Sequence, residues 1–228
     1  MRGVLLQVRL DSSRLPEKAL LPLQDLTVIE HAMRSLKEVH AEKYVVVTTE
    51  DSYSKLFPLT KKWGFDIFIG SKNNVLKRYV DAIDFFNLNQ IVRATGDNPL
   101  VFSTLANRLI ELHNSNNNDY SGFLNNPIGT GVEVVNSSVL KIALSKTTQN
   151  YDKEHVTPYI YNNKAQFKVF QGDAPEEFLF KNSFATIDTV EDFNRIEKLY
   201  DELYYGDIIR AESVIQWLKK EQLSYTLT

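Results

Sequence analysis

The sequence contains no cysteine, and that absence removes several kinds of chemistry. Disulfide bonds, thiolate metal sites and cysteine nucleophiles are all excluded. A large excess of one charge is also missing, because 26 lysines and arginines stand against 29 aspartates and glutamates, for a net charge of -3. This balance gives no general field for holding nucleic acid or an anionic membrane surface, so any positive charge that binds a ligand must be local.

Long hydrophobic runs are missing as well. The apolar stretch over residues 3–8 is too short for a signal-peptide core, and no later run approaches the length of a membrane span. The chain also has no internal repeat and no low-complexity tract. With 43% hydrophobic and 24% charged residues in 228, it has the balance of an ordinary globular protein. We therefore expect a cytoplasmic protein that binds neither nucleic acid nor membrane.

The first half of the sequence alternates between strand-like and helix-like segments. Strands are predicted as short apolar or β-branched runs, and helices from their amphipathic spacing and capping residues. The predicted strands are 3–8, 44–49, 65–69 and 90–94, and the predicted helices are 27–37, 52–63, 74–86 and 103–113. Buried strands that alternate with helices are typical of a mostly parallel sheet with helices on both faces. The sequence therefore predicts an α/β, Rossmann-like fold with a mixed, mostly parallel sheet.

The second half is less regular and begins with a polar loop at residues 114–118. The strands predicted here are 131–135, 167–170 and 184–187, and the helices are 138–146, 152–162 with Pro158 interrupting or opening it, 189–203 and 211–221. No linker-like segment separates the halves, so we expect residues 1–228 to form a single domain.

The first predicted strand runs directly into a loop that carries three cations, Arg9, Arg14 and Lys18. Ligands of open α/β sheets bind in the crevice beyond the carboxyl ends of the strands, and this loop should lie there. The planar fork of arginine donates two hydrogen bonds to a phosphate, whereas lysine acts as a mobile point charge. The loop therefore indicates a polyanion, most simply a nucleoside triphosphate. The alternative is that the three cations are exposed on a solvated turn.

Several segments resemble the motifs of the cytidylyltransferase family. The loop positions Gln7, Arg9, Ser12, Arg14, Leu15, Pro16 and Lys18 are similar to the family's signature loop. Residues 95–100 resemble its T-G-D-x-P-L motif, residues 154–160 resemble E-H-V-T-P-Y-I, and residues 187–192 resemble V-D-T-P-E-D. A weaker match covers residues 70–79. The resemblance extends from residue 3 to about residue 200.

The resemblance implies the fold of nucleotide-diphospho-sugar transferases and a reaction. CMP would pass from CTP to a sugar or sugar acid, with release of pyrophosphate, in the synthesis of polysaccharide or glycan precursors. It further implies that Arg14 and Lys18 contact the triphosphate and act in catalysis with Asp97, and that Asp97 and Asp188 hold Mg²⁺. The other expected nucleotide-binding residues are Gln7, Arg9, Ser12, Ser71, Arg78, Thr95 and Gly96, and the expected acceptor-binding residues are Glu133, His155 and Tyr159.

The two halves of the domain would then have different binding roles. Residues 1–113 would bind the nucleotide, and residues 114–228 would bind the acceptor and offer a homodimer surface. Tyr204, Tyr205 and the last helix could contribute to that surface. CTP, or another nucleoside triphosphate, and a sugar-type acceptor are the expected partners.

Local physics supports a metal role for Asp97 and leaves alternatives open. Asp97 follows the strand 90–94 and should emerge at the same sheet edge as Arg9, and Gly96 allows the backbone to approach a ligand. Magnesium prefers a few carboxylates together with phosphate oxygens and water. Asp97 could instead close a turn, and Asp188 could stand before a helix only because the helix dipole favours an acid there. His155 is more simply a residue that shapes the acceptor pocket than a general base.

Two positions depart from the family pattern. The chain has Asp11 and Glu17 where the family usually has small residues, often glycine. Carboxylates there would repel a triphosphate unless they point to solvent or pair with a cation, and they favour an alternative in which the protein binds nucleotide without catalysis. A second alternative is a nucleotide-sugar glycosyltransferase. Such enzymes commonly carry an Asp-x-Asp motif, which is absent from this sequence.

Overall fold

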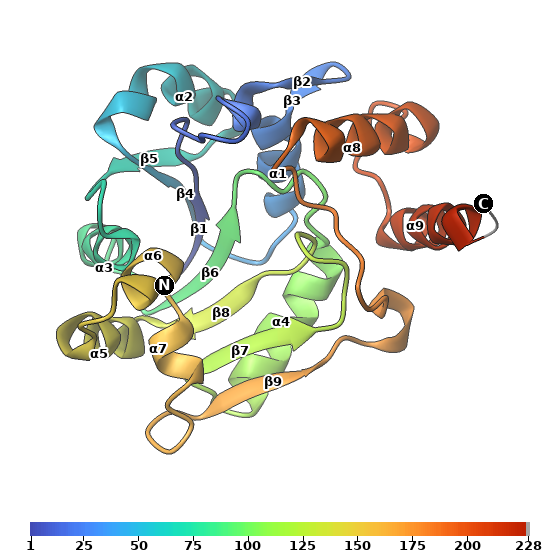
Figure 1. The fold of residues 1–228 in the computed structure, drawn as a ribbon. Coiled ribbons are helices and arrows are strands. Elements are labelled where there is room, and N and C mark those ends of the chain that lie inside the picture. The colour runs from blue at the N-terminus through green and yellow to red at the C-terminus, as the bar shows by residue number, and fades with distance from the viewer. Residues whose placement is uncertain (227–228) are drawn as a thin grey trace.

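A seven-stranded sheet forms the centre of the computed structural model, which describes residues 1–226 (Figure 1). In spatial order its strands are β5 (Asp66–Ile69), β4 (Lys43–Thr48), β1 (Arg2–Gln7), β6 (Gln90–Thr95), β8 (Glu133–Asn136), β7 (Tyr120–Leu124) and β9 (Val169–Asp173). The first four strands are mutually parallel, β8 is antiparallel to both of its neighbours, and β9 is parallel to β7. The predicted mixed, mostly parallel α/β sheet is confirmed. A small hairpin, β2 (Pro22–Leu23) and β3 (Leu26–Thr27), lies apart from it.

Helices cover both faces of this sheet because its strands are apolar on both sides. One face packs against α1 (Val28–Leu36), α2 (Glu50–Trp63) and α4 (Ser103–Ser115). The other packs against α3 (Val75–Phe85), α5 (Ser137–Lys146) and the short α7 (Pro158–Tyr161), with α6 (Asn150–His155) against α3. In β1 the side chains alternate between the two cores, since Val4 and Leu6 face the first and Leu5 faces the second.

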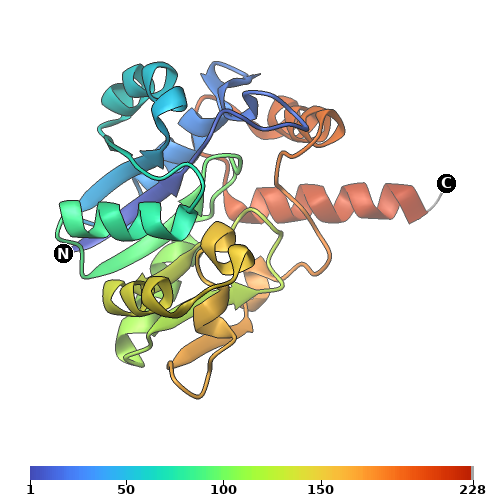
Figure 2. The same cartoon turned by 60° about the vertical axis from the view of Figure 1, so that its left-hand side comes forward.

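The last two helices form a third apolar cluster outside the sheet. Here α8 (Val190–Leu203) and α9 (Ala211–Thr226) pack with the hairpin residue Leu23 and with Phe178 of a 3-10 turn, Glu176–Phe178. Trp217 of α9 is buried in this cluster. Figure 2 shows α9 extending away from the sheet, with the C-terminus at its far end. No helix within residues 1–226 combines the length and apolarity needed to cross a membrane.

Several helix ends lie where the sequence predicts them, because local capping chemistry determines them. Glu30 accepts a hydrogen bond from the backbone N–H of Thr27 at 2.9 Å, at the start of α1. Gly64, in the left-handed conformation with φ of 65°, ends α2. The Thr189 hydroxyl accepts from the backbone N–H of Asp192 at 3.2 Å and caps α8.

In the second half the structure lacks one predicted strand, adds a strand, and confirms that Pro158 opens a separate helix. Residues 184–187 are not a strand, because they cross the strand ends and their backbone bonds to loops: Ala185 N–H to Ile128, and Ile187 N–H to Asp97. The helix predicted over 152–162, with Pro158 interrupting or opening it, is two helices: Pro158 opens the second, as predicted, and the break lies at Val156, whose φ of 75° no helix continues. The strand β7 is present where no strand was predicted.

Candidate active site

The carboxyl ends of β1 and β6 bring two loops together. The two strands are adjacent and parallel, with Gln7 beside Thr95 in the register. The backbone N–H of Gly96 donates to the Gln7 carbonyl at 2.8 Å. A Cβ atom at Gly96 would lie 2.9 Å from the Cβ atom of Val8, so only glycine allows this close approach. The basic loop and the 95–98 loop therefore border the same crevice.

This crevice holds a polar cavity of about 400 Å³, which we call the basic cavity. Eight of the predicted site residues line it: Gln7, Arg9, Ser12, Arg14, Lys18, Thr95, Asp97 and Asp188. The Leu10 backbone N–H donates to the Ser52 hydroxyl of α2 at 3.1 Å, and this bond anchors the basic loop. The Gln7 side-chain oxygen Oε1 is buried and has no hydrogen-bond partner within residues 1–226.

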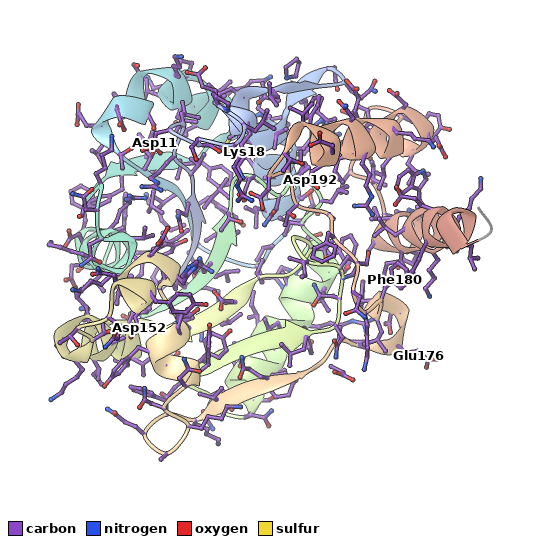
Figure 3. All side chains as sticks on the ribbon, viewed as in Figure 1. Asp11, Lys18, Asp152, Glu176, Phe180 and Asp192 are labelled. Carbon is purple, nitrogen blue, oxygen red and sulfur yellow. The ribbon has the colours of Figure 1, made fainter. Side chains whose placement is uncertain are left out.

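Lys18, which is labelled in Figure 3, is the centre of the charge network in the basic cavity. Its Nζ atom donates to Asp97 Oδ2, to Asp188 Oδ1 and to the Ile187 carbonyl, each at 2.7 Å. The Lys18 side chain is only 11% exposed, whereas that of Arg14, 3.1 Å from Asp188, is 66% exposed. The basic cavity thus contains one enclosed cation, Lys18, between two carboxylates, and two more exposed cations, Arg9 and Arg14.

The pKa values in this network reflect mutual stabilisation of the charges. Burial alone would lower the pKa of Lys18, but Asp97 and Asp188 outweigh burial and raise it. Burial alone would raise the pKa of Asp188, but its hydrogen bond to Lys18 outweighs burial and lowers it. Both groups are therefore charged at neutral pH.

Asp192 positions Asp188 from the first turn of α8. Its Oδ2 atom accepts hydrogen bonds from the backbone N–H groups of Asp188 at 3.0 Å and Thr189 at 2.9 Å. Because Asp192 belongs to the capping box of α8, the helix start fixes the backbone that carries Asp188. The sequence motif at 187–192 contains this acid, but its positioning role follows only from the geometry.

The two aspartates of the basic cavity fit a divalent cation that also binds phosphate. Asp97 and Asp188 converge on one point, since both contact the same Nζ atom at 2.7 Å. Within residues 1–226 no group of three or more acidic or histidine side chains could hold a metal ion. Two carboxylates that need phosphate oxygens and water to complete the shell are the usual arrangement for Mg²⁺. Lys18 would have to leave that point for the ion to enter.

The two carboxylates that depart from the family pattern are both paired with cations. Glu17 forms an ion pair with Lys55 of α2 and does not line the basic cavity. Its backbone has a φ of 53°, a left-handed conformation that glycine adopts more easily. Asp11 does line the cavity, and it lies 3.5 Å from Arg9 and 3.7 Å from Lys72.

Ser71 and Arg78 do not line the basic cavity. The buried guanidinium of Arg78 donates to the Ser71 carbonyl, from Nε at 2.9 Å and from Nη2 at 2.7 Å. The Ser71 hydroxyl accepts from the backbone N–H of Asn74 at 3.2 Å. In this structure the two residues hold the loop before α3, and Arg9 touches that loop through the Lys72 carbonyl at 3.4 Å.

A second cavity of about 600 Å³ adjoins the first, and Thr95 lines both. We call it the amide cavity, because four asparagines line it: Asn98, Asn125, Asn126 and Asn182. Glu133, predicted to bind the acceptor, also lines this cavity. His155 and Tyr159 line neither cavity: His155 is exposed with its ring centre 4.3 Å from that of Tyr151, and Tyr159 packs against Phe167.

Glu133 is held by a buried network in the wall of the amide cavity. Its carboxylate accepts from Arg93 at 2.5 Å, from the Tyr120 hydroxyl at 2.7 Å and from the Thr157 hydroxyl at 2.8 Å. Burial opposes the charge of Arg93, but Glu133 outweighs burial and raises the Arg93 pKa. Burial and the Glu133 charge both raise the pKa of Tyr120. Sequence reasoning missed Arg93 and Tyr120, and the one signal in the sequence was a cation inside a predicted apolar strand.

Comparison with known proteins bears on this site. The sequence pattern of the family described as Cytidylyltransferase matches residues 4–223. The chain is 35% identical over 221 residues to an uncharacterized protein of Methanocaldococcus jannaschii, covering 95% of this chain and 89% of that one. It is 33% identical over 223 residues to the spore coat polysaccharide biosynthesis protein SpsF of Bacillus subtilis, covering 95% and 93%. The solved structure of a cytidylyltransferase from Leptospira borgpetersenii superposes with a TM-score of 0.88 at 30% identity, covering 97% of this chain and 94% of that one.

Proposed function

The chain belongs to the cytidylyltransferase family, and we propose that it transfers CMP from CTP to a sugar-type acceptor in the synthesis of a polysaccharide precursor. The single observation that carries the proposal is the convergence of Lys18, Asp97 and Asp188 in the basic cavity. The cavity offers cations for a triphosphate and two carboxylates for a metal ion, at the sheet edge where α/β proteins bind nucleotides.

In the proposed reaction an acceptor hydroxyl attacks the α-phosphorus of CTP. One P–O bond forms, the bond to the β-phosphate bridging oxygen breaks, pyrophosphate leaves, and the proton of the acceptor hydroxyl passes to solvent water. Such a transfer needs alignment and charge neutralisation and requires no covalent intermediate with the protein. The lack of cysteine is therefore no obstacle.

The side chains of the basic cavity divide these tasks. Asp97 and Asp188 would hold Mg²⁺, which neutralises phosphate charge when bound. Lys18 exchanges its carboxylate partners for phosphate oxygens, a short move for a flexible side chain that is already in the cavity. The exposed Arg14 folds over the triphosphate and holds the leaving pyrophosphate in a bidentate contact.

The proposal is tested by pyrophosphate release from CTP with purified protein, Mg²⁺ and a panel of sugars. Asp97→Asn should abolish release and leave the fold intact, because Lys18 keeps its bond to Asp188. The matched control is Asp84→Asn, an exposed carboxylate on α3 that pairs with Lys141 outside both cavities. Tight CTP binding without release under a broad acceptor screen would favour a non-catalytic nucleotide-binding subunit instead.

Association into a homodimer remains part of the proposal. Of the two tyrosines predicted to form the surface, Tyr204 packs on His31, with ring centres 5.1 Å apart. Tyr205 is exposed and is the one available to a second copy. Light scattering measures the oligomeric state directly, and Tyr205→Ser should shift a dimer toward monomer.

A further inference from the structure

Resting on the proposed function, we infer that Glu154 is the general base of the transfer and that Thr157 positions it. The Glu154 carboxylate orients the attacking acceptor hydroxyl and takes its proton. Glu154 begins the motif at residues 154–160, but sequence reasoning gave it no role. Three observations carry the inference: its place in the basic cavity, its lack of a partner, and the strained turn that follows it.

The basic cavity contains one carboxylate that no cation neutralises. Within residues 1–226, four carboxylates line it: Asp11, Asp97, Glu154 and Asp188. The other three form ion pairs with the nearby cations Arg9, Arg14, Lys18 and Lys72. The exposed side chain of Glu154 forms no ion pair or hydrogen bond in this part of the chain. An unpaired carboxylate beside a triphosphate is unfavourable unless a ligand group donates a hydrogen bond to it, and the attacking hydroxyl is such a donor.

Glu154 lies apart from the point where Asp97 and Asp188 would hold the metal ion. No group of three acidic or histidine side chains within residues 1–226 could hold one ion, so Glu154 is not a third ligand there. Among the residues that the structure describes, it is also the one between 98 and 187 that lines the basic cavity. That part of the chain supplies most of the lining of the amide cavity. Glu154 therefore reaches the nucleotide from the half of the domain that is expected to bind the acceptor.

A strained turn fixes the direction of the chain directly after Glu154. Val156 has a φ of 75° and a ψ of -54°, and the backbone N–H of Thr157 donates to the His155 carbonyl at 2.9 Å. This is a γ-turn with a positive φ at its centre, which is rare and strained, above all for a β-branched residue. Such strain persists only where the surroundings impose it, and it is concentrated at functional sites. Val156 is fully buried, so tertiary packing imposes the turn.

Two buried contacts hold the chain on either side of Glu154. Before it, the Asp152 carboxylate accepts from the Thr147 hydroxyl at 2.5 Å, and both residues are buried. After it, the hydroxyl of the buried Thr157 donates to Glu133 of β8 at 2.8 Å and ties the turn to the sheet. Thr157 lines neither cavity, so it acts on the reaction only through the residues that it holds in place.

The proton transfer to Glu154 balances within the proposed reaction. As the acceptor oxygen forms its bond to the α-phosphorus, its O–H proton moves to a carboxylate oxygen of Glu154. The bond from the α-phosphorus to the bridging oxygen breaks, and pyrophosphate leaves with that electron pair. Because the Glu154 side chain is exposed, the carboxylic acid then releases the proton to solvent water and returns to its starting state.

Single-turnover kinetics of Glu154→Gln test the assignment, because glutamine keeps the shape of the side chain but cannot take the proton. The protein is in excess over CTP labelled at the α-phosphate, with Mg²⁺ and the sugar of the panel that gives the fastest pyrophosphate release. The rate should fall about 100-fold. The affinities for α,β-methylene-CTP and for Mn²⁺ should stay within about twofold of those of the parent protein. The matched control is Glu197→Gln, an exposed glutamate of α8 that lines neither cavity, and it should react at the parent rate.

Three other results would overturn the assignment of Glu154. A single-turnover rate within about threefold of the parent rate would exclude a general base. A loss of Mn²⁺ affinity would make Glu154 a metal ligand. A loss of affinity for α,β-methylene-CTP would make it a residue that binds the ribose or the phosphates.

Variants of Thr157 test its positioning role. Thr157→Val removes the hydroxyl that bonds to Glu133 and should lower the single-turnover rate about tenfold, with the affinity for α,β-methylene-CTP unchanged. Thr157→Ser keeps a hydroxyl and should react within about twofold of the parent rate. In the Glu154→Gln background, Thr157→Val should cause no further loss, because both changes affect the same proton transfer. Equal losses in the two Thr157 variants, or additive losses in the double variant, would refute the positioning role. The Glu154→Gln measurement stands even if Thr157→Val fails to fold.

Failure of this inference is distinguishable from failure of the proposed function. If the parent protein releases pyrophosphate and Glu154→Gln does so equally fast, the transfer reaction stands and the general base is refuted. If the parent protein releases no pyrophosphate with any sugar of the panel, the proposed function fails, and the assignment of Glu154 is refuted with it.

Discussion

Replacing Lys18 with methionine removes the ammonium group that joins Asp97 to Asp188 and leaves most of the side chain in place. Three hydrogen bonds of 2.7 Å are lost, and two carboxylates lose a shared counter-ion. Because those carboxylates are partly exposed, we discount the loss for solvent screening to about 1 to 2 kcal/mol. For a chain of this size that lowers the melting temperature by roughly 3 to 6 °C.

The same substitution should have opposite effects on catalysis and on metal binding. Loss of a cation that neutralises phosphate charge should lower kcat/KM for CTP by about 100-fold or more. Without nucleotide, however, Mn²⁺ should bind the Lys18→Met variant more tightly, about tenfold, because the ammonium no longer occupies the point between the carboxylates. Electron paramagnetic resonance of free Mn²⁺ measures this binding independently of activity.

The difference in stability between Lys18→Met and the parent protein should also depend on pH in a defined direction. The pKa of Asp188 is lowered in the folded protein, so its stabilisation is present above its ordinary value of 3.8 and disappears as the pH falls below it. The pKa of Lys18 is raised, so its contribution is present below its ordinary value of 10.5 and is lost only at higher pH. The stability difference should therefore be constant near neutral pH and shrink in acid.

A surface variant provides the control for Lys18→Met. Lys55→Met removes a lysine that pairs with Glu17 outside the basic cavity, and it should change neither kcat/KM nor Mn²⁺ binding. The roles assigned to Lys18 are refuted if Lys18→Met keeps its activity within about threefold of the parent protein. They are also refuted if Mn²⁺ binds Lys18→Met and the parent protein with equal affinity.

Three further substitutions test other contacts. Burial would raise the pKa of Glu30, but hydrogen bonds led by Lys62 lower it from 4.5 to about 2. Glu30→Gln should therefore destabilise the protein by about 2 kcal/mol at pH 7 and by much less at pH 2. An equal loss of stability at the two pH values, measured by urea unfolding, would contradict this prediction. Glu17→Gly relieves the strain of a left-handed backbone but removes an exposed ion pair with Lys55. Calorimetry should therefore show a melting temperature that is unchanged or higher by up to about 3 °C. A clear fall in the melting temperature would show that the ion pair with Lys55 dominates. Asp11→Asn removes a carboxylate that lines the basic cavity and should lower the KM for CTP about threefold. A higher KM would mean that Asp11 helps the cavity bind CTP by positioning a cation.

The features that the sequence predicts well are those determined locally. The strand that leads into the basic loop is a continuous apolar run, and the capping pairs at Thr27 and Thr189 are recognisable within four residues. The strand β7 escaped prediction because Ser121 and Gly122 interrupt its apolar pattern. Residues 184–187 have strand-like composition, yet their place across the strand ends depends on contacts with residues distant in the chain.

The candidate site also combines features that are determined locally with features that depend on contacts between distant segments. Arg9, Arg14 and Lys18 share one loop, so their common location follows from the strand that precedes them. The hydrogen bonds from Lys18 to Asp97 and Asp188 connect three segments that are distant in the sequence, so the spacing of the residues could not predict them. Nor could the inward turn of Arg78 onto the Ser71 carbonyl, because an amphipathic helix pattern does not specify where a long side chain finds its partner.

Thermal unfolding in the presence of nucleotides tests the central claim most directly, because it needs no knowledge of the acceptor. At CTP and Mg²⁺ concentrations about 100 times the dissociation constant, ligand binding contributes about 2.7 kcal/mol, or roughly 5 to 10 °C in melting temperature. We predict this shift with CTP and Mg²⁺ together, a smaller shift without Mg²⁺ or with ATP, and almost none in Lys18→Met. A melting temperature that CTP leaves unchanged, or a full shift in Lys18→Met, would contradict the assignment of the basic cavity as the nucleotide site.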